Sequence, residues 1–229
     1  MKEYYEIKKQ ICEVGLRLWQ LGFVAANDGN ITVKVDADVF LTTPTGVSKS
    51  FLTPEMIIAV NSEGKVLDDV TKYKPSSELP MHIRCYRERE DIRAVIHAHP
   101  PVATGFAIAH IPLDSYTMPE AIIFLGSVPI AKYGTPSTNE IPDAVAEHLP
   151  LHDTMLLENH GALTVGVDLM TAYYRMETLE HFAKITLTAR QLGGEIELSD
   201  KQIADCLQLR EKFNVPGKHP GYKKYTSQT

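Results

Sequence analysis

Cysteine is scarce in this 229-residue chain, which has only Cys12, Cys85 and Cys206. Three widely separated cysteines do not make a disulfide framework, and each stands in a helical pattern, so we expect small buried or half-buried residues. Long apolar runs are also missing, and none approaches the roughly 20 residues of a membrane-spanning helix. The first residues carry acidic side chains and no apolar core of a secretory signal, which predicts a cytoplasmic protein with no membrane partner.

Positive charge is in short supply as well. The chain has 23 Lys and Arg against 29 Asp and Glu, for a formal net charge of −6. Proteins hold nucleic-acid phosphates with basic patches, so this balance argues against nucleic acid as a partner. It does not exclude a single phosphate group, which backbone N–H groups and hydroxyls can hold locally. No linker-like stretch and no internal repeat interrupts the chain, and we expect residues 1–229 to form one domain.

Hydrophobic periodicity predicts a mixture of helices and strands. Helical spacing is found over residues 2–21, 76–89, 102–109, 139–148 and 168–192. A serine is the expected N-cap of the second helix, and Ser199 with Gln202 forms a capping-box pattern that opens a further helix. Short apolar or alternating runs predict strands over residues 31–35, 39–42, 57–60, 65–67, 94–97, 128–131, 154–157 and 162–165. The first four would pair as two hairpins, which favours a layered α/β fold with a largely antiparallel sheet.

The motif His97-Ala98-His99 ends the apolar run of residues 94–97. In a strand, residues i and i+2 point to the same face about 6.6 Å apart, so both imidazoles can aim at one metal ion. Two ordinary histidines capped by carbonyls or water are the alternative interpretation. A His-x-His pair followed directly by Pro100-Pro101 is less easily explained in that way, and we favour the metal site.

A third ligand is needed, and His160 is the natural candidate because it follows the apolar run Met155–Leu157 in a turn. Three neutral ligands with open positions are typical of catalytic rather than structural zinc. His160 alone has a simpler explanation, since Asn159-His160-Gly161 can be a hairpin turn in which Gly161 supplies a positive φ.

Glu78 also has two interpretations. It can be a carboxylate at a helix N-terminus, where the helix dipole favours negative charge, or a general acid/base beside the metal ion. His82 lies four residues further on and could share a helix face with Glu78 as a rival ligand pair. We rank that pair lower, because the following residues Ile83–Tyr86 indicate that His82 belongs to a packed helix face.

Three segments of small polar residues could bind an anion. They are Asn27-Asp28-Gly29-Asn30, Thr43-Pro44-Thr45-Gly46 and Ser76-Ser77. The first two are turn sequences in the first place, but each adjoins a strand and has free N–H donors, as an anion-binding nest requires. The serines add hydroxyls at a helix start. Taken together, the three segments predict a phosphate pocket.

These polar segments, His97-Ala98-His99 and Asn159-His160-Gly161, in this order and spacing, resemble the class II aldolase and L-ribulose-5-phosphate 4-epimerase superfamily. The similarity runs from the first helix to the long helix that ends near Leu192. It implies a three-layer α/β/α domain with a largely antiparallel central sheet. It further implies a Zn²⁺ enzyme, with Mn²⁺ or Co²⁺ as alternatives, that acts on a small phosphorylated sugar as a homotetramer with active sites between subunits.

Carried over residue by residue, the resemblance implies a full set of site residues. His97, His99 and His160 would hold zinc, and Glu78 would be the acid/base that can also occupy a vacant coordination position. The implied phosphate-binding residues are Asn27, Asn30, Thr45, Gly46, Ser76 and Ser77. Tyr116 aligns with a catalytic tyrosine that the adjacent subunit supplies. Tyr222 and Tyr225 are both candidates for the C-terminal tyrosine of the aldolases.

Two details favour the aldolase branch of the superfamily. The epimerases carry Asp at the position of Glu78 and Lys-Pro-Ser-Gly in place of Thr43-Pro44-Thr45-Gly46. The implied reaction is reversible cleavage of a ketose 1-phosphate, such as L-fuculose 1-phosphate, to dihydroxyacetone phosphate and an aldehyde through a metal-stabilised enediolate. Pentulose-5-phosphate 4-epimerisation and methylthioribulose-1-phosphate dehydration are alternatives on the same site. A non-catalytic adducin-like interaction domain ranks lower, because the histidines and the glutamate are all present.

Overall fold

The computed structural model describes residues 4–67, 71–135, 138–221 and 223–225. Its centre is a seven-stranded sheet in the order β3-β2-β1-β4-β7-β6-β5. The strands are β1 (Asn30–Asp36), β2 (Val39–Thr42), β3 (Ile58–Val60), β4 (Ala94–Ala98), β5 (Ile130–Ala131), β6 (Thr154–Leu157) and β7 (Gly161–Gly166). Neighbouring strands are antiparallel except β5 and β6, which are parallel. The prediction of a largely antiparallel sheet is confirmed.

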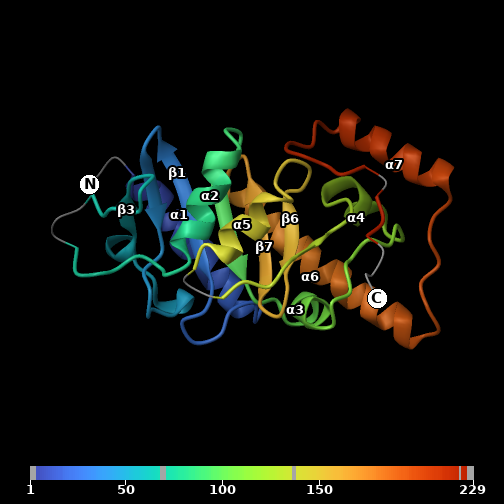
Figure 1. Ribbon diagram of the computed structural model, residues 1–229, viewed down its shortest axis with the longest axis horizontal. Coiled ribbons are helices and arrows are strands. Elements are labelled where there is room, and N and C mark those ends of the chain that lie inside the picture. The colour runs from blue at the N-terminus through green and yellow to red at the C-terminus, as the bar shows by residue number, and fades with distance from the viewer. Residues whose placement is uncertain (1–3, 68–70, 136–137, 222, 226–229) are drawn as a thin grey trace.

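Helices cover both faces of this sheet (Figure 1). They are α1 (Tyr5–Gln20), α2 (Leu79–Glu88), α3 (Pro101–Ile108), α4 (Pro119–Phe124), α5 (Glu140–Ala146), α6 (Leu169–Gln191) and α7 (Asp200–Lys212), with short 3-10 turns η1 (Lys49–Phe51) and η2 (Pro54–Met56). Apolar residues of α1, α3 and α6 share one buried cluster, and those of α2 and α5 share another. The fold therefore has the three α/β/α layers that the resemblance implied.

The alternation of side chains along β4 shows how the two clusters arise. Ala94, Ile96 and Ala98 belong to the cluster under α1, α3 and α6, whereas Val95 belongs to the cluster under α2 and α5. Because successive side chains of a strand point to opposite faces, His97 lies on the same face as Val95. That face is the one covered by α2, whose N-terminus follows Glu78.

Two elements differ from the prediction. Helix α4 was not predicted, and residues 65–67 form no strand but a single bridge between Val60 and Val66. The capping box that opens α7 is confirmed, since Ser199 and Gln202 bond each other's backbone N–H groups. The cysteines lie in α1, α2 and α7 as free thiols, as expected. Within the described ranges, no helix combines the length and apolar character needed to cross a bilayer.

The predicted serine cap of α2 is wrong. The N-cap residue is Glu78, and its side chain makes no capping hydrogen bond. The Ser76 hydroxyl accepts a hydrogen bond from the Glu78 backbone N–H at 3.2 Å and another from the Asn30 side-chain amide at 3.2 Å. Ser76 thus ties the start of α2 to β1, and the Glu78 carboxylate is left to point elsewhere.

Candidate metal centre

Three histidines from two distant segments meet at one end of the central strands. His97 is in β4, His99 follows β4, and His160 lies in the turn between β6 and β7. Their ring centroids are 4.6 to 5.3 Å apart, and one ligand nitrogen of each lies within 4.8 Å of the others. The antiparallel pairing of β4 with β7, in which Ala98 is opposite Ala162, brings the two segments together.

Backbone contacts orient the His97 ring. Its Nδ1 lies 3.0 Å from the carbonyl oxygen of Ala162, which can only accept, so Nδ1 carries the hydrogen and Nε2 presents its lone pair. This Nε2 is 3.0 Å from Nε2 of His99. The His99 ring is held from its other side, where Nδ1 lies 3.5 Å from an Asp28 carboxylate oxygen. Two imidazole nitrogens at this separation suit a cation shared between them.

Gly161 permits the close approach of these rings. A Cβ at this position would lie 2.6 Å from the Ala98 carbonyl oxygen and 2.6 Å from Cδ2 of His99, closer than real Cβ contacts. The turn before β7 does contain a positive φ, but the residue is Asn159, at 54°. The interpretation of Gly161 as the turn's positive-φ residue is therefore wrong. Its role is to leave room for the imidazoles.

The Glu78 carboxylate stands directly in front of two of the histidines. Oε1 is 3.2 Å from Nε2 of His160, and Oε2 is 3.4 Å from Nε2 of His97. The Asn30 side-chain amide donates a hydrogen bond to Oε2 at 2.7 Å and fixes the carboxylate in place. His82, the rival ligand, is fully buried with Nδ1 2.9 Å from the Thr32 hydroxyl, so it packs on the sheet as the sequence favoured.

Burial sets the protonation states that a metal ion would meet. Complete burial lowers the pKa of His97 to about 3, although the charge of Glu78 opposes this shift. Burial also lowers the pKa of His99, with the charge of His160 adding to the effect. Burial alone would raise the pKa of Glu78, but His97, His160 and the Asn30 hydrogen bond outweigh it and hold that pKa well below its usual range. The neutral imidazoles of His97 and His99 beside an ionised carboxylate are donors that fit a divalent metal such as zinc.

The candidate phosphate-binding segments lie next to Glu78. Asn30 is buried and bonds both Ser76 and Glu78. The Thr45 backbone N–H donates to the Lys74 carbonyl oxygen at 2.9 Å, and Pro44 forms a bridge with Pro75, so residues 43–46 adjoin the two serines. The exposed residues among the candidate phosphate-binding residues are Asn27, Thr45, Gly46 and Ser77. The structure thus collects all three polar segments around one carboxylate.

Sequence reasoning missed two polar residues of this region. Asp28 was noted only as part of a turn, yet it contacts the ring of His99. Lys49 was not singled out, yet its ammonium is buried and donates to the carbonyl oxygens of Asn27 and Val47 at 3.2 and 3.1 Å. A lysine between two serines reads as an exposed turn residue, so no local signal marks it.

Tyr116 lies in a separate buried cluster with residues of α4 and α7. Its hydroxyl donates to the Gly221 carbonyl oxygen at 2.6 Å and accepts from the Lys223 backbone N–H at 2.8 Å. Tyr225 is held nearby, since its backbone N–H donates to an Asp114 carboxylate oxygen at 2.6 Å. Tyr222 lies outside the described residues. The role of Tyr116 at a neighbouring subunit's site stays a prediction.

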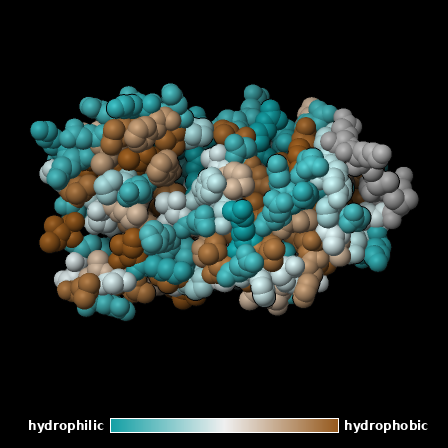
Figure 2. All heavy atoms as spheres, turned by 180° about the vertical axis from the view of Figure 1, so that it is seen from behind, coloured by the Kyte–Doolittle hydropathy of each residue, from teal (hydrophilic) through white to brown (hydrophobic). Residues whose placement is uncertain are grey.

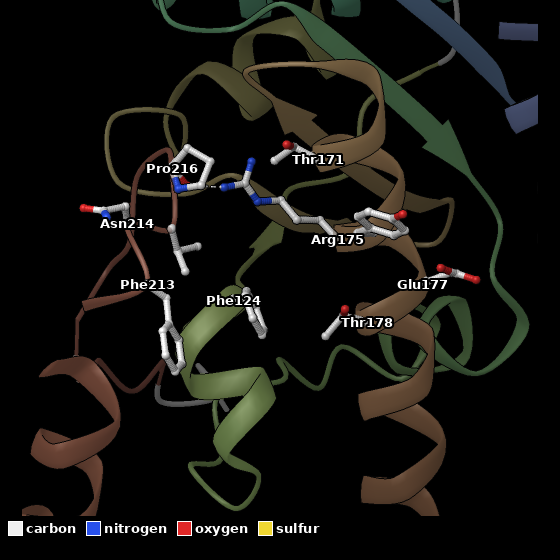
Figure 3. A pocket seen from close by; sticks show the side chains of 10 residues that line it. Phe124, Thr171, Arg175, Glu177, Thr178, Phe213, Asn214 and Pro216 are labelled. Atoms are coloured by element: carbon white, nitrogen blue, oxygen red, sulfur yellow. Dashed lines mark hydrogen bonds between the residues drawn. The ribbon is translucent and has the colours of Figure 1, made fainter. Parts of the chain in front are cut away.

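A cleft of about 540 Å³ lies elsewhere, between α4, α6 and the segment after α7 (Figure 3). Its walls include the aromatic rings of Phe124, Tyr174 and Phe213 together with the guanidinium of Arg175. None of the predicted site residues is among its described lining residues. We therefore place the candidate site at the histidines rather than in this cleft.

Known proteins are similar in sequence to this chain over most of its length. A sequence model of the class II aldolase and adducin N-terminal domain matches residues 9–187. An L-fuculose phosphate aldolase of Methanococcus vannielii is 35% identical over 177 residues, which are 77% of this chain and 93% of that protein. The L-fuculose phosphate aldolase of Escherichia coli K12 is 31% identical over 216 residues, 94% of this chain and 97% of that protein.

Solved structures agree. An L-fuculose 1-phosphate aldolase aligns with a TM-score of 0.82 and 28% identity over 91% of this chain and 96% of that chain. The L-fuculose-1-phosphate aldolase of Thermus thermophilus gives a TM-score of 0.73 and 33% identity over 86% and 100%. The chain belongs to the family of class II aldolases and adducin N-terminal domains. It is a class II aldolase, a lyase, and its three histidines could bind the metal on which such aldolases depend.

Proposed function

We propose that this chain is a zinc-dependent aldolase that cleaves a ketose 1-phosphate, such as L-fuculose 1-phosphate, reversibly to dihydroxyacetone phosphate and an aldehyde. The observation that carries the proposal is the meeting of three imidazoles and one carboxylate beside the polar segments. The relatives named L-fuculose phosphate aldolase support the choice of substrate.

The proposed zinc ligands are His97, His99 and His160. When bound, the ion would supply a Lewis acid for the negative charge that develops on a substrate oxygen as the carbon–carbon bond breaks. Imidazole sites accept several divalent ions, so Mn²⁺ and Co²⁺ are the alternatives to zinc. The carbonyl of Ala162 and the carboxylate of Asp28 hold two of the rings in place for this task.

Glu78 is the proposed acid/base. The Asn30 amide holds its carboxylate at 2.7 Å, close to the imidazoles. From this position the ionised Glu78 would remove a proton from the carbon that forms the new bond in condensation, and in cleavage the protonated Glu78 would return that proton to the same carbon. The hydroxyl that becomes the aldehyde must lose its proton, and Tyr116 of a neighbouring subunit would take part in that transfer.

The substrate phosphate would be held by the polar segments next to Glu78. The proposed residues are Asn27, Asn30, Thr45, Gly46, Ser76 and Ser77. Because Asn30 bonds both Ser76 and Glu78, a phosphate gripped here would be placed at a fixed distance from the acid/base. Such positioning can lower the activation barrier of the reaction by about 7 kcal/mol or more.

We further infer a homotetramer with active sites between subunits. Trp19 of α1 and Ile185 of α6 are among the exposed large apolar side chains. Seen from behind, apolar side chains gather in several groups between polar ones (Figure 2), and a neighbouring subunit could cover such groups. Of the two candidates for the C-terminal tyrosine, Tyr225 lies among the described residues, where its backbone N–H donates to an Asp114 carboxylate oxygen. The cytoplasmic location remains a prediction from the sequence.

A direct assay tests the reaction. The purified zinc-loaded enzyme is incubated with a panel of ketose 1-phosphates and pentulose 5-phosphates, and dihydroxyacetone phosphate is measured with a coupled enzyme. Release of dihydroxyacetone phosphate from a ketose 1-phosphate is expected. Epimerisation of a pentulose 5-phosphate without it, or dehydration of methylthioribulose 1-phosphate, would replace the aldolase proposal. A protein that retains no metal would point to the non-catalytic, adducin-like alternative.

A further inference from the structure

Lys49 is one of the largest fully buried side chains of the described residues, with 1% of its surface exposed. It begins η1, which packs against α1 at Gly15. A Cβ at Gly15 would lie 3.0 Å from Cδ1 of Leu52 and 3.2 Å from the Lys49 carbonyl oxygen. Glycine inside a helix is less favourable than alanine. Here it lets η1 approach α1 closely enough to bury a lysine.

The ammonium of Lys49 joins two loops of the candidate phosphate pocket. Nζ donates to the carbonyl oxygen of Asn27 at 3.2 Å and to that of Val47 at 3.1 Å. An ammonium has three N–H donors, so these carbonyls use two of them. No carboxylate in the described part of the chain forms an ion pair with Lys49. Its charge is therefore not neutralised by direct contact.

Arg210 offers a contrast. It too is buried without an ion pair in the described structure, but its guanidinium donates to four carbonyl oxygens, those of Ile123, Pro216, Gly217 and Lys218. These bonds hold the segment after α7 and give Arg210 a complete structural explanation. The Lys49 ammonium donates to only two carbonyl oxygens. Because it lies beside the candidate phosphate-binding residues, we looked to the substrate for a further partner of its charge.

The surroundings of Lys49 are negative. Burial lowers its pKa to about 8, while the charges of Asp28 and Glu78 act in the opposite direction. The ammonium therefore stays mostly protonated at neutral pH. A phosphate dianion that entered this region would be repelled by Asp28 and Glu78, and by the carbonyl dipoles of Asn27 and Val47 if nothing bound them.

We propose that Lys49 is a positioning residue for the phosphate monoester dianion of the substrate. Its ammonium ties the loop at Asn27 to the loop at Val47, and its charge offsets the repulsion that Asp28 and Glu78 exert on the phosphate. This inference rests on the proposed function, because it assigns the anion to the polar segments of that site. It adds to them a buried cation that neither the motif nor its turn chemistry indicated.

The test compares K49M with K9M, a matched loss of one positive charge at an exposed position of α1. Inorganic phosphate is the probe, measured as a competitive inhibitor of cleavage and by the melting-temperature shift it causes. We expect K49M to raise both the phosphate Ki and the substrate KM about 10- to 100-fold, the effect of one charged hydrogen bond. The kcat and the zinc content should stay close to wild type, K9M should match wild type, and K49R should recover part of the affinity.

A folded, zinc-loaded K49M with wild-type phosphate affinity would overturn the inference. Should K49M not fold, a crystal structure of the wild-type enzyme with inorganic phosphate decides instead. Phosphate bound between the loops at Asn27 and Val47 supports the role of Lys49, and phosphate bound only elsewhere refutes it. If wild type cleaves no ketose phosphate, the proposed function fails by itself, and the melting-temperature shifts of wild type, K49M and K9M still test Lys49.

Discussion

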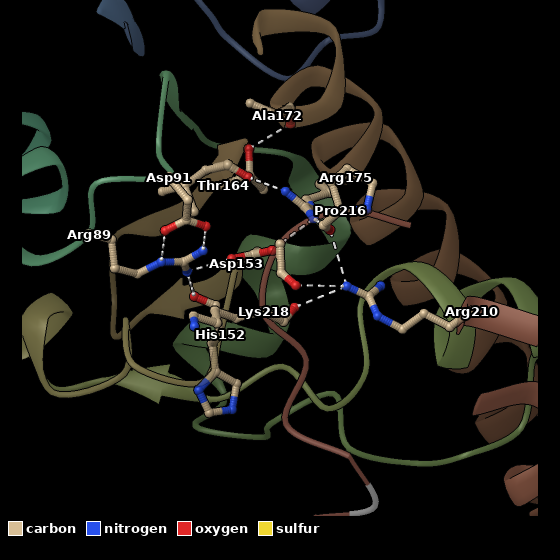
Figure 4. Close-up of polar contacts among 12 residues, drawn as sticks. Arg89, Asp91, His152, Asp153, Thr164, Ala172, Arg175, Arg210, Pro216 and Lys218 are labelled. Atoms are coloured by element: carbon tan, nitrogen blue, oxygen red, sulfur yellow. Dashed lines mark hydrogen bonds and ion pairs between the residues drawn. The ribbon is translucent and has the colours of Figure 1, made fainter. Parts of the chain in front are cut away.

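The two ends of strands β4 and β6 each carry a cluster of ionisable side chains, and the two clusters differ in how their groups face one another. Before the strands begin, Asp153 contacts Arg89 at 2.5 Å and Arg175 at 2.7 Å (Figure 4). Arg89 also pairs with Asp91 at 2.6 Å. After the strands end, the nitrogens of His97, His99 and His160 face one another and a single carboxylate. The first cluster pairs its carboxylates with arginines. The second gathers imidazole nitrogens whose lone pairs suit a cation.

This difference separates a polar cluster that stabilises the fold from one that is suited to bind a ligand. Both places gather ionisable side chains within a few ångströms of one another, so such a gathering does not identify the site by itself. What distinguishes them is which groups face one another: arginines face carboxylates in the first cluster, whereas imidazoles face one another and a carboxylate in the second. Arg175 also donates to the carbonyl oxygens of Val165 and Pro216, so two further N–H groups of its guanidinium have partners. The variants below either break one cluster or show how far the other depends on it.

The largest effect is expected from His160→Ala. Removing one of three imidazoles leaves two ligands, too few to retain the ion, and we expect loss of both bound metal and measurable cleavage. Metal content by mass spectrometry and the rate of dihydroxyacetone phosphate release check this. The Asp153 network should be untouched, so the melting temperature of the metal-free variant should match that of metal-free wild type. A variant that keeps stoichiometric zinc would contradict the ligand role.

Glu78→Gln comes next. The amide keeps the size of the side chain but cannot move a proton, so we expect zinc to remain while turnover falls by about 10²- to 10⁴-fold. The measurement is metal content together with kcat on the same preparation. Full activity of this variant would rule out Glu78 as the acid/base, and loss of zinc would instead make it an essential ligand.

Asp153→Asn should damage the fold and leave the chemistry alone. The change removes the charge that two buried arginines share, and breaking a buried pair costs about 3–5 kcal/mol of unfolding free energy. Urea denaturation measures this loss. The control is Asp91→Asn, where the carboxylate is 41% exposed and the expected loss is at most about 1 kcal/mol. If the folded Asp153→Asn enzyme lost its zinc, the two clusters would be coupled and the contrast between them would fail.

The smallest effect concerns His82, which has one partner and one bare nitrogen. Its Nδ1 lies against the Thr32 hydroxyl, and its Nε2 has no partner among the described residues. Burial lowers the pKa of His82 from 6.5 to about 4, with Glu78 opposing. The unfolded chain therefore takes up the proton first as the pH falls. The stability that neutral His82 contributes is present above pH 6.5 and is lost as the pH falls from there to about 4.

His82→Leu should remove this contribution to the acid sensitivity. Over the whole range from pH 6.5 to about 4, the contribution is roughly 3 kcal/mol of unfolding free energy. Thr32 keeps its hydroxyl contact with Thr42 in the variant, so no buried hydroxyl is orphaned. Urea denaturation of wild type and variant between about pH 7 and pH 5 measures the slope. Equal slopes would mean that His82 is not the group that titrates.

Much of the fold followed from local pattern. The continuous apolar run of residues 94–97 predicted a strand, which is β4 and is buried throughout, and the capping box at Ser199 predicted the start of α7. Helix α4 was missed because its six residues are too short for a helical period to repeat. The serine cap of α2 was predicted wrongly because a contact with Asn30, far away in sequence, takes the Ser76 hydroxyl. That all residues form one domain stays a prediction.

The site residues likewise divide into those that local sequence predicted and those that depend on contacts between distant segments. His97 and His99 could be grouped from sequence because the spacing of a strand is a local property. His160 was predicted as the third ligand from its place in a turn after an apolar run. That it meets the other two depends on the pairing of β4 with β7, which is not encoded in either segment alone. Lys49 could not be found at all, because its burial depends on the packing of η1 against Gly15. The chemical roles of these residues stay predictions until the assays are done.

Gly161 has a consequence for how this protein can change over time. The volume beside its Cα is already filled by the Ala98 carbonyl and the His99 ring, so even one methyl group has nowhere to go. Every other amino acid carries at least that methyl group. A lineage that abandons glycine here must therefore first rearrange His99, and with it the ion-binding chemistry. Gly161 therefore cannot be substituted in any descendant protein that still depends on the metal.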